Sequence, residues 1–343
     1  MSSKKIAVSV VIKALNEEDN IARTIESALR SIKNIGGEVI LADSYSIDRT
    51  VEIASRYPIK IVKLSCPEDR CCGVGGQLGY QVARGEFIWI VDGDMELVEG
   101  FIEVAISCLL KEPNLAGVGG RIVEKNLESL EYRARLLRAP EHLQAGIVDR
   151  LDGGAVYRRI AIEMVSYFTN KNLHAYEEYE LAVRLRSCGW FLKRIPNDAV
   201  FHFGHKTEAF ALLLSRWRNK YAYGIGELLR SAIGKPHFRL VVREINELHL
   251  YGIVVFWWIV MFSLFVFGIF TEQTKIVMLI VLLLPFLIMI LKKNSIISGL
   301  YSVVSWNVYA VGLLRGFFKR QRSPSEKIGC VFLESCCVIT EKN

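Results

Sequence analysis

The sequence predicts an α/β fold in which a mostly parallel sheet is flanked by helices and followed by transmembrane helices. Short apolar, β-branched runs alternate with helical segments over the first hundred residues, a pattern typical of right-handed strand–helix–strand crossovers. Residues 251–291 carry only two charged side chains, Glu272 and Lys275. The mean hydropathy of +0.27 is high for a soluble enzyme, and this segment supplies much of the excess.

Four strands and three helices are expected in order. The strands are expected at residues 8–12, 38–42, 59–64 and 86–91. The first is a short apolar, β-branched run that fits a strand buried on both faces. The helices are expected at residues 21–29, 51–56 and 77–84. An acidic turn at 16–20 begins the first helix, Gly36 and Gly37 end it, and a loop rich in cysteine and glycine precedes the third.

Polar and acidic residues follow three of these strands. Asn16 and Glu17 come after the first strand, Asp43 after the second, and the Asp92-Gly93-Asp94 triplet after the fourth. Ligands of open parallel sheets bind beyond the carboxyl ends of the strands, so three acidic clusters are expected to converge on one crevice. Taken singly, Asp43 is also compatible with a helix cap, and Glu17 with a partner of the helix dipole.

The Asp92-Gly93-Asp94 triplet is a D-x-D motif placed directly after a buried strand. Two carboxylates that flank a glycine can approach one divalent cation, and Mg²⁺ or Mn²⁺ prefers carboxylate and phosphate oxygens. A bare D-x-D also occurs as an ordinary polar turn. Its place after the apolar run 87–91 is what indicates a metal-binding site.

Residues 6–205 resemble the inverting family 2 glycosyltransferases, whose GT-A fold is Rossmann-like. Five blocks carry the resemblance in order: residues 10–18, 43–50, 79–86 and 92–94, and the run E-E-Y-E-L-A-V-R-L at 177–185 with Gly189 and Trp190. The resemblance implies an enzyme, a hexosyltransferase that binds a nucleotide-diphosphate sugar. The chain is similar to transferases that act on polyprenyl phosphate or on lipid-linked glycans.

The resemblance also implies roles for residues at the donor side. The nucleotide sugar is expected to contact Asn16, Glu17, Asp43, Asp92 and Arg70. Asp94 is expected to hold a divalent metal, Mg²⁺ or Mn²⁺, with Asp92 and His202 as further ligands. His205 is the alternative to His202, and both are otherwise polar loop histidines.

At the acceptor side, the resemblance makes Glu178 the general base, with Glu177 beside it. Glu180 and Arg184, four residues apart on the same helix, fit an orienting ion pair instead. The chain departs from the family in having Glu178 where aspartate is usual and Asp43-Ser44-Tyr45 in place of D-D-G. It also has residues 76–79 where the family often carries Arg-Asn, so Arg70 is the candidate for the basic contact to the diphosphate.

The C-terminal third predicts membrane attachment. Residues 207–250 are expected to form amphipathic juxtamembrane helices, and residues 251–320 a membrane region. Residues 251–270 and 275–291 form a hairpin of two spans, and Lys292 and Lys293 place its flanks in the cytosol. Residues 295–318 either span or lie at the interface; a crossing would put the basic run 319–322 outside, so the interfacial interpretation is favoured. Residues 321–343 then form a cytosolic tail, and the catalytic domain, residues 1–206, also lies on the cytoplasmic side of the cell membrane.

These observations predict a metal-dependent inverting glycosyltransferase that moves a sugar from a UDP- or GDP-sugar to a membrane or lipid-linked acceptor. Arg121, Arg216 and Trp217 are assigned to the acceptor side. Two alternatives stay open: a catalytically silent GT-A scaffold, suggested by Glu178, and a processive polysaccharide synthase, suggested by a partial Q-x-x-R-W signature that ends in Trp217. The basic residues gather beside the apolar region, which favours an anionic membrane surface over nucleic acid as a partner.

Overall fold

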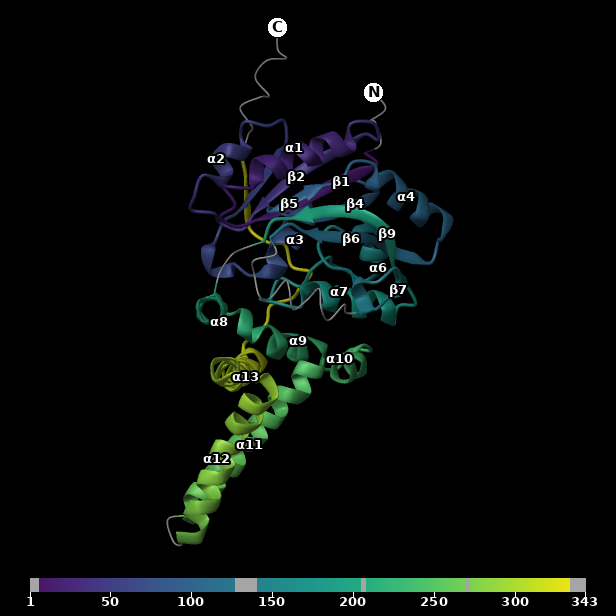
Figure 1. The fold of residues 1–343 in the computed structure, drawn as a ribbon. Coiled ribbons are helices and arrows are strands. Elements are labelled where there is room, and N and C mark those ends of the chain that lie inside the picture. Colours follow the sequence, from purple (N-terminus) through teal and green to yellow (C-terminus); the bar gives the residue numbers. More distant parts are fainter. Residues whose placement is uncertain (1–5, 127–140, 205–207, 269–271, 334–343) are drawn as a thin grey trace. The chain divides into compact units, whose positions relative to one another are not determined.

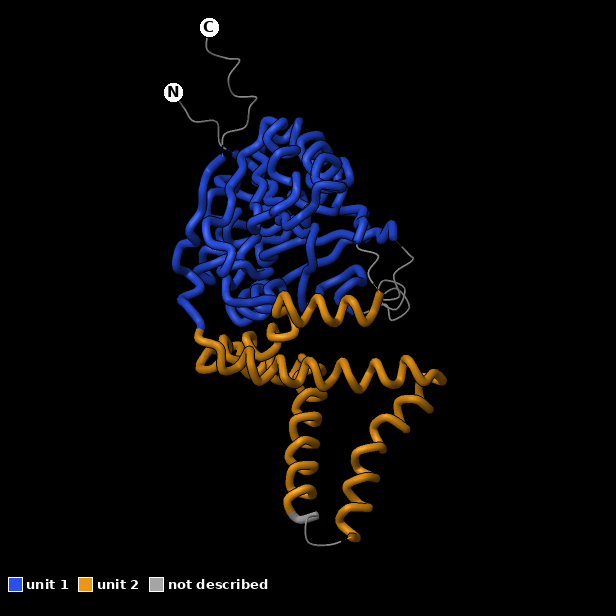
Figure 2. Tube along the Cα trace, turned by 90° about the vertical axis from the view of Figure 1, so that its left-hand side faces the viewer, with its two compact units in different colours: residues 1–207, 321–343 blue, residues 208–320 orange. Residues whose placement is uncertain are grey.

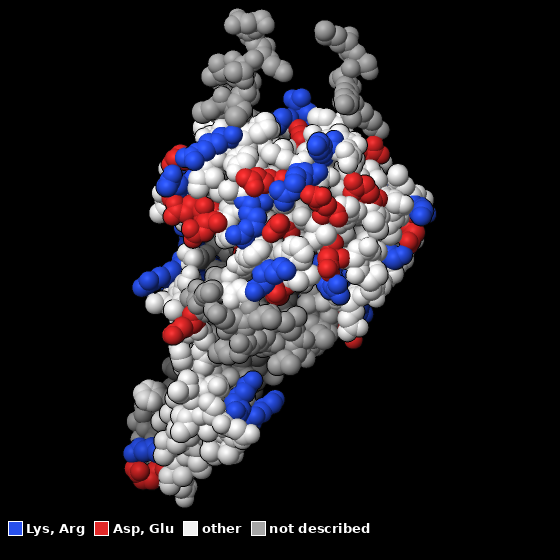
Figure 3. Space-filling view, turned by 45° about the horizontal axis from the view of Figure 1, so that its top comes forward, with Lys and Arg blue, Asp and Glu red and all other residues white. Residues whose placement is uncertain are grey.

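The computed structural model describes residues 6–126, 141–204, 208–268 and 272–333. The chain divides into two compact units, which Figure 2 draws in blue and orange. The sheet unit comprises residues 1–207 and 321–343, and the helical unit comprises residues 208–320. On the face seen in Figure 3, acidic and basic side chains are interspersed rather than gathered by sign.

The centre of the sheet unit is a run of four parallel strands in the order β3-β2-β1-β4. The strands are β1 (Val8–Ala14), β2 (Gly37–Asp43), β3 (Lys60–Leu64) and β4 (Phe87–Asp92), and they are joined through α1 (Ile21–Ile32), α2 (Thr50–Ala54) and α3 (Cys72–Val82). Successive side chains of β1 enter different hydrophobic cores, Val10 and Ile12 on one face and Val11 on the other. This burial on both faces explains why the strands read as continuous apolar runs, and it confirms the predicted α/β core (Figure 1).

One predicted loop was wrong, because α3 begins at Cys72 and takes in the glycine-rich residues 73–76. These glycines allow the helix to touch its neighbours. A Cβ atom on Gly79 would lie 2.2 Å from Cγ1 of Val11, and one on Gly73 would lie 1.9 Å from the carbonyl oxygen of Asn170. Glycine lowers helix propensity. At these two positions, however, a larger residue would collide with β1 or with the loop that contains Asn170.

The second half of the sheet mixes parallel and antiparallel pairs. It contains β5 (Met95–Leu97), β6 (Leu115–Glu124), β7 (Gly146–Val148), β8 (Val156–Arg158) and β9 (Phe191–His202), with the helices α4 (Phe101–Lys111), α6 (Arg159–Met164) and α7 (Glu177–Ser187). β8 pairs antiparallel with β4, and β6 pairs parallel with β9. β9 therefore places His202, its last residue, beside Glu124 at the end of β6 and opposite Met95 of β5.

The chain after the helical unit is part of the sheet unit. Strand β10 (Cys330–Leu333) pairs antiparallel with β3 and forms an edge of the sheet. Before it, the Gln81 side chain exchanges two hydrogen bonds with the backbone of Ile328, and Lys171 pairs with Glu326. The predicted cytosolic tail is thus packed against the sheet unit from Arg322 to Leu333; the rest of it lies outside the described residues.

The helical unit begins with short helices and continues with long ones. The short ones are α8 (Ala209–Arg218), the 3₁₀ turn η3 (Tyr221–Tyr223), α9 (Gly224–Ala232) and α10 (Phe238–Glu244). Three further helices, α11 (Asn246–Gly268), α12 (Glu272–Lys293) and α13 (Ile296–Phe318), are long and apolar enough to cross a membrane, with mean hydropathies of 2.0, 2.8 and 1.4. These helices overlap the predicted apolar segments at 251–270, 275–291 and 295–318, of which residues 269–270 lie outside the described residues. That the segments span a membrane stays a prediction.

Candidate active site

The turn after β1 is joined to the turn before α2 by a series of hydrogen bonds. The backbone N–H groups of residues 16, 17 and 18 donate to the side chains of Ser46, Thr50 and Asp48, at 2.9, 2.7 and 3.1 Å. In return, the Asn16 side chain accepts from the N–H of Ile47. Asn16 has a φ of 57°, a conformation that asparagine tolerates better than most residues. The two turns therefore hold each other in place at the carboxyl edge of the sheet.

Asp43 ends β2 at the same edge and is fully buried. Its carboxylate accepts hydrogen bonds from the backbone N–H groups of Tyr45 and Ser46, at 3.1 and 3.0 Å. The carboxylate therefore shapes the 44–46 turn. Its predicted contact with the nucleotide stays a prediction.

The Asp92-Gly93-Asp94 triplet directs its two carboxylates to different partners. Asp92 Oδ1 lies 2.9 Å from Nζ of Lys13, on β1, whereas Asp94 Oδ2 lies 3.2 Å from Nε2 of His202. A hydrogen bond from α1 fixes the backbone of the triplet, because the hydroxyl of Thr24 donates to the carbonyl of Gly93 at 2.7 Å. A Cβ on Gly93 would lie 2.7 Å from Cγ of Glu17, so glycine is needed for the first and third acidic clusters to meet.

The clustering of acidic side chains alters Glu17 in particular. Burial, and next the nearby charge of Asp94, raise the pKa of Glu17 to about 7. A carboxyl whose pKa is that high is poised to bind a cation or to donate a hydrogen bond. Glu17, Asp94 and Asp92 are thus brought together as the sequence predicted.

A second group of carboxylates stands at the start of α7. Glu177 and Glu178 follow Tyr176, whose φ of 67° ends the preceding loop. Lys13 Nζ lies 3.9 Å from Glu177 and 3.6 Å from Glu178, as well as 2.9 Å from Asp92. Burial raises the pKa of Glu178 to about 8, although the Lys13 charge acts in the opposite direction. One ammonium group therefore joins the D-x-D triplet to the predicted base.

Helix α7 rests on a buried ion pair, as predicted. Arg184 contacts Glu180 through two hydrogen bonds of 2.9 Å, and it also donates to the carbonyls of Val165, Tyr167 and Phe168. Both side chains are almost fully buried. This network ties the helix that carries Glu178 to the loop 165–168, so the pair positions the acidic residues of the helix start.

The imidazole of His202 lies between two carboxylates, those of Glu124 and Asp94. His202 Nδ1 lies 2.6 Å from a carboxylate oxygen of Glu124, and its Nε2 faces Asp94. Burial disfavours the charged imidazole, but the hydrogen bonds to Asp94 and Glu124 outweigh it and raise the pKa of His202 to about 10. An imidazole backed by a carboxylate is a common arrangement for a metal ligand. Asp94 and His202 fit a divalent cation that takes its remaining ligands from a substrate.

Within the described residues, no group of three or more His, Cys, Asp or Glu side chains is close enough to hold a metal by itself. Asp92, the third predicted ligand, is paired with Lys13. Mg²⁺ usually takes only one or two carboxylates and completes its shell with phosphate oxygens and water. The donor set is therefore consistent with a metal that binds together with a nucleotide. His205, the alternative ligand, lies outside the described residues.

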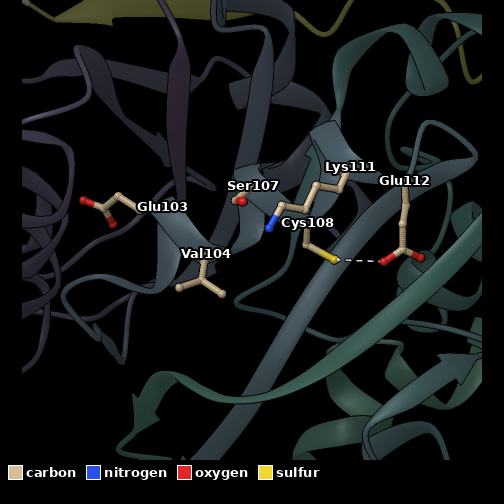
Figure 4. A pocket seen from close by; sticks show the side chains of 6 residues that line it. All are labelled: Glu103, Val104, Ser107, Cys108, Lys111 and Glu112. Atoms are coloured by element: carbon tan, nitrogen blue, oxygen red, sulfur yellow. Dashed lines mark hydrogen bonds between the residues drawn. The ribbon is translucent and has the colours of Figure 1, made fainter.

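The remaining predicted site residues lie elsewhere. Arg70 follows a short 3₁₀ turn after β3, and Arg121 is exposed on β6, where it pairs with Asp198. Arg216 and Trp217 belong to α8 in the helical unit, where Arg216 lies over the Tyr221 ring. These four assignments stay predictions. A hollow over α4, drawn in Figure 4, is lined by Glu103, Val104, Ser107, Cys108, Lys111 and Glu112 and contains none of the predicted site residues.

Sequence reasoning missed Lys13 and Glu124. Lys13 carried a usable signal, because the other residues of its strand are buried and, except for Ser9, apolar, and a lysine in such a place is rarely unpaired. Glu124 carried none. It ends a long strand, and only the pairing of β6 with β9 reveals that His202 lies beside it.

The comparisons with known proteins agree with this geometry. Residues 9–180 match the model of "Glycosyl transferase family 2", which is half of the chain. The chain is a family 2 glycosyltransferase. The matched segment begins in β1 and ends in α7, so it contains Lys13, the D-x-D triplet and Glu177–Glu178.

Curated relatives of this family 2 glycosyltransferase align with it over only part of each chain. The succinoglycan biosynthesis protein ExoO of Rhizobium meliloti is 25% identical over 53% of this chain and 56% of its own. The glucosyltransferase WfaP of Escherichia coli, named for a GlcNAc-diphosphoundecaprenol acceptor, is 36% identical over 25% of this chain and 35% of its own. A dolichol-phosphate mannosyltransferase of Pyrococcus furiosus is 25% identical over 34% of each chain. The chain thus spans about a third to a half of these relatives.

Solved structures share the fold. The mannosyltransferase PcManGT of Pyrobaculum calidifontis, solved with GDP-Man and Mn²⁺, has a TM-score of 0.58 at 17% identity over 92% of this chain and 88% of its own. Residues 1–349 of TarS from S. aureus have a TM-score of 0.52 at 14% identity over 92% of this chain and 93% of that one. The GT-A fold predicted for this glycosyltransferase is therefore confirmed.

Proposed function

We propose that this family 2 glycosyltransferase is a metal-dependent, inverting enzyme that moves one sugar from a UDP- or GDP-sugar to a lipid-linked acceptor. The observation that carries the proposal is Lys13. Its ammonium contacts Asp92 of the D-x-D triplet and both Glu177 and Glu178. A donor-binding carboxylate and a candidate base are thereby held within the reach of one side chain.

The donor side would be formed by Asp94 and His202, with Glu124 behind the imidazole. A divalent cation bound there would neutralise the charge that develops on the departing diphosphate. Glu17, with a pKa raised to about 7, stands at the edge of this site and would contact the donor. Asn16 and Asp43 hold the two turns that border it.

The acceptor side would be served by Glu178. In inverting transfer, the acceptor hydroxyl attacks the anomeric carbon from the face opposite the diphosphate, the bond to the diphosphate oxygen breaks, and the hydroxyl proton passes to a base. Glu178 as carboxylate would take that proton. Its pKa, raised to about 8 by burial, makes it a stronger base than an exposed glutamate, and Lys13 keeps it from rising further.

A membrane setting supports a lipid-linked acceptor. Three helices are long and apolar enough to cross a bilayer, and two relatives are named for polyprenol acceptors. We place the sheet unit on the cytoplasmic side of the cell membrane, because Lys292 and Lys293 end α12 and positive residues favour that side. The acceptor would be a polyprenyl phosphate or a lipid-linked glycan.

The decisive test removes the metal ligand. In full-length protein in detergent or vesicles, Asp94→Ala should abolish sugar transfer and remove the Mn²⁺ dependence of UDP or GDP binding, while thermal unfolding stays close to that of the parent. Glu99→Ala is a control for loss of a carboxylate outside the site, since Glu99 is exposed and pairs with Arg30 at the end of α1. Transfer at the parental rate by Asp94→Ala would sink the proposal. Hydrolysis of a panel of UDP- and GDP-sugars would then identify the donor.

A catalytically silent scaffold is separated by a second variant. Glu178→Gln keeps the shape of the side chain but cannot accept a proton, so transfer should fall by at least about 100-fold, the low end of the contribution of a general base. Binding of the nucleotide should be unchanged. Parent protein that binds a nucleotide sugar with Mn²⁺ but transfers nothing to any lipid-linked acceptor would instead favour the scaffold.

A further inference from the structure

The chain re-enters the sheet unit after its last apolar helix. β10 pairs with β3 from Cys330↔Leu64 to Leu333↔Ile61, and the N–H of Arg322 donates to Asn172 at 2.9 Å. Strands of one hydrogen-bonded sheet must lie on the same side of a membrane, because a ladder cannot form across a bilayer. The segment between residues 207 and 322 must therefore cross the membrane an even number of times, although three of its helices are long enough to cross.

The helix that does not cross is identified by its contacts. α13 packs backbone to backbone against η3 and α9, which precede the first long helix. A Cβ atom on Gly312 would lie 2.2 Å from the carbonyl oxygen of Ala222, and one on Gly316 would lie 2.1 Å from that of Tyr223. Lys319, just after α13, pairs with the fully buried Glu227 of α9 at 2.9 Å.

Near its start, α13 also contacts one of the short helices that precede α11. The Tyr301 ring makes an edge-to-face contact with Phe210 of α8, 5.0 Å between centroids. The short helices α8 to α10 are rich in arginine and lysine, so they cannot enter the hydrocarbon core. α13 contacts these short helices from Tyr301 to Lys319, most of its length. It must therefore lie at the same depth relative to the membrane as they do. Figure 1 agrees, since α13 is seen end-on where α11 and α12 run down the picture.

The contacts of α13 with the long helices fit this arrangement. Trp258, midway along α11, donates to Asn307 at 2.7 Å, and the Tyr251 ring, near the start of α11, stacks on Tyr309. In α12, the contact is with Ile290, near the end of the helix. None of these contacts involves the described residues near the α11–α12 turn, which would meet α13 if it ran alongside the hairpin.

The other face of α13 is apolar and uncovered. Its exposed side chains are Ile296, Ile297, Leu300, Val304, Leu314 and Phe318. At 100° per residue they fall within about a third of the helix circumference, opposite the glycines that pack on α9. Arg315, Lys319 and Arg320 flank the end of this face. An apolar face bordered by bases and continuous with two membrane helices suits the headgroup–acyl boundary of an anionic bilayer.

We propose that α13 lies in the plane of the membrane, with its Leu300–Val304–Leu314 face in contact with lipid, so that only α11 and α12 cross. The partner of this surface is the bilayer itself. The proposal does not depend on the activity of the enzyme. The last apolar segment is then an interfacial helix rather than a third span.

Sidedness is the first test. Full-length protein carrying a different epitope at each end is placed in sealed membrane vesicles and treated with protease from outside. Two crossings expose or protect both epitopes together, and detergent then exposes any that were protected. One epitope exposed and the other protected would mean an odd number of crossings and would overturn the proposal.

Depth is the second test, and α12 supplies the matched control. A fluorescent amino acid is introduced at Leu300, Val304 or Leu314, or at the exposed positions Leu279, Leu283 or Leu287 of α12, and is quenched by lipids brominated at successive acyl carbons. A spanning α13 would place positions 300 and 314 about 21 Å apart in depth. We expect equal, shallow depths along α13 and a gradient along α12. A gradient along α13, or no quenching there by any lipid, would overturn the proposal.

Discussion

Lys13→Met removes the ammonium that joins the two acidic groups while keeping a side chain of similar length. Two unit charges about 4 Å apart attract by about 4 kcal/mol at an effective dielectric constant of 20 and by about 1 kcal/mol in bulk water. Lys13 is 14% exposed and Glu178 is 27% exposed, so an intermediate value of about 2–3 kcal/mol is appropriate. At 1.36 kcal/mol per unit, the pKa of Glu178 should rise by about 2 units.

The kinetic consequence follows from the fraction of ionised base. With its pKa raised by burial to about 8, Glu178 is only partly ionised at pH 7.5, and losing about 2–3 kcal/mol of attraction lowers its ionised fraction by a further factor of roughly 50–100. We expect kcat/KM of Lys13→Met to fall on the order of 50- to 100-fold at pH 7.5. The deficit should narrow as the pH rises, because the variant regains its carboxylate.

The assay is the pH dependence of sugar transfer between pH 6.5 and 9.5, with Lys13→Arg as the variant that keeps the charge. Lys193→Met is the control for loss of a lysine–carboxylate pair, since Lys193 pairs with Glu112 at 2.6 Å away from the site. If Lys13→Met lowered kcat/KM equally at every pH and left the midpoint of the pH profile unchanged, Lys13 would have only a structural role. Parental activity would refute the role altogether.

Three further outcomes are expected. In the parent, kcat/KM should rise as the pH passes about 8, because burial raises the pKa of Glu178 to about that value and only its carboxylate accepts a proton; a flat profile from pH 6.5 to 9 would contradict this. Arg184→Met leaves the buried carboxylate of Glu180 without its cation, which should destabilise the fold by about 3–5 kcal/mol and lower Tm by about 10 °C. The double variant in which Glu180 is also replaced by Met should recover most of the lost stability. Deletion of residues 321–343 removes β10 and should lower Tm and promote aggregation, whereas deletion of 334–343, which keeps β10, should not; equal behaviour of the two truncations would mean that β10 contributes little.

The first half of the sheet could be predicted because local pattern and final structure agree there. The runs that became β1, β2 and β4 are largely apolar since residues on both faces of each strand are buried, and β3 has three buried apolar residues beside Lys60 and Lys63. The acidic residues at their ends could be placed for a similar reason, because parallel strands bring their carboxyl ends to one edge. Glu17, Asp43 and the D-x-D triplet required no knowledge of distant contacts.

Features that depend on tertiary contacts could not be predicted in this way. The glycine-rich start of α3 reads as a loop, and only the close approach of Gly73 to Asn170 and of Gly76 to Thr169 explains why glycines stand in this helix. Glu124 meets His202 through a strand pairing that spans 78 residues. The parity of membrane crossings depends on β10, a four-residue strand whose partner lies far earlier in the chain.

The pairing of β10 with β3 also fixes an order of events during synthesis. β3 is complete when Leu64 has been made, but its partner ends at Leu333, and at about 5–20 residues per second the chain needs roughly 15–55 seconds to reach it. Throughout that time β3 is an open edge, protected chiefly by Lys60 and Lys63, the kind of charged residue that discourages edge-to-edge association. The hairpin of α11 and α12 emerges from the ribosome within this interval. If α11 and α12 insert into a membrane as proposed, insertion begins before the sheet closes, and a chain truncated after Arg320 would keep β3 as an unpaired edge strand.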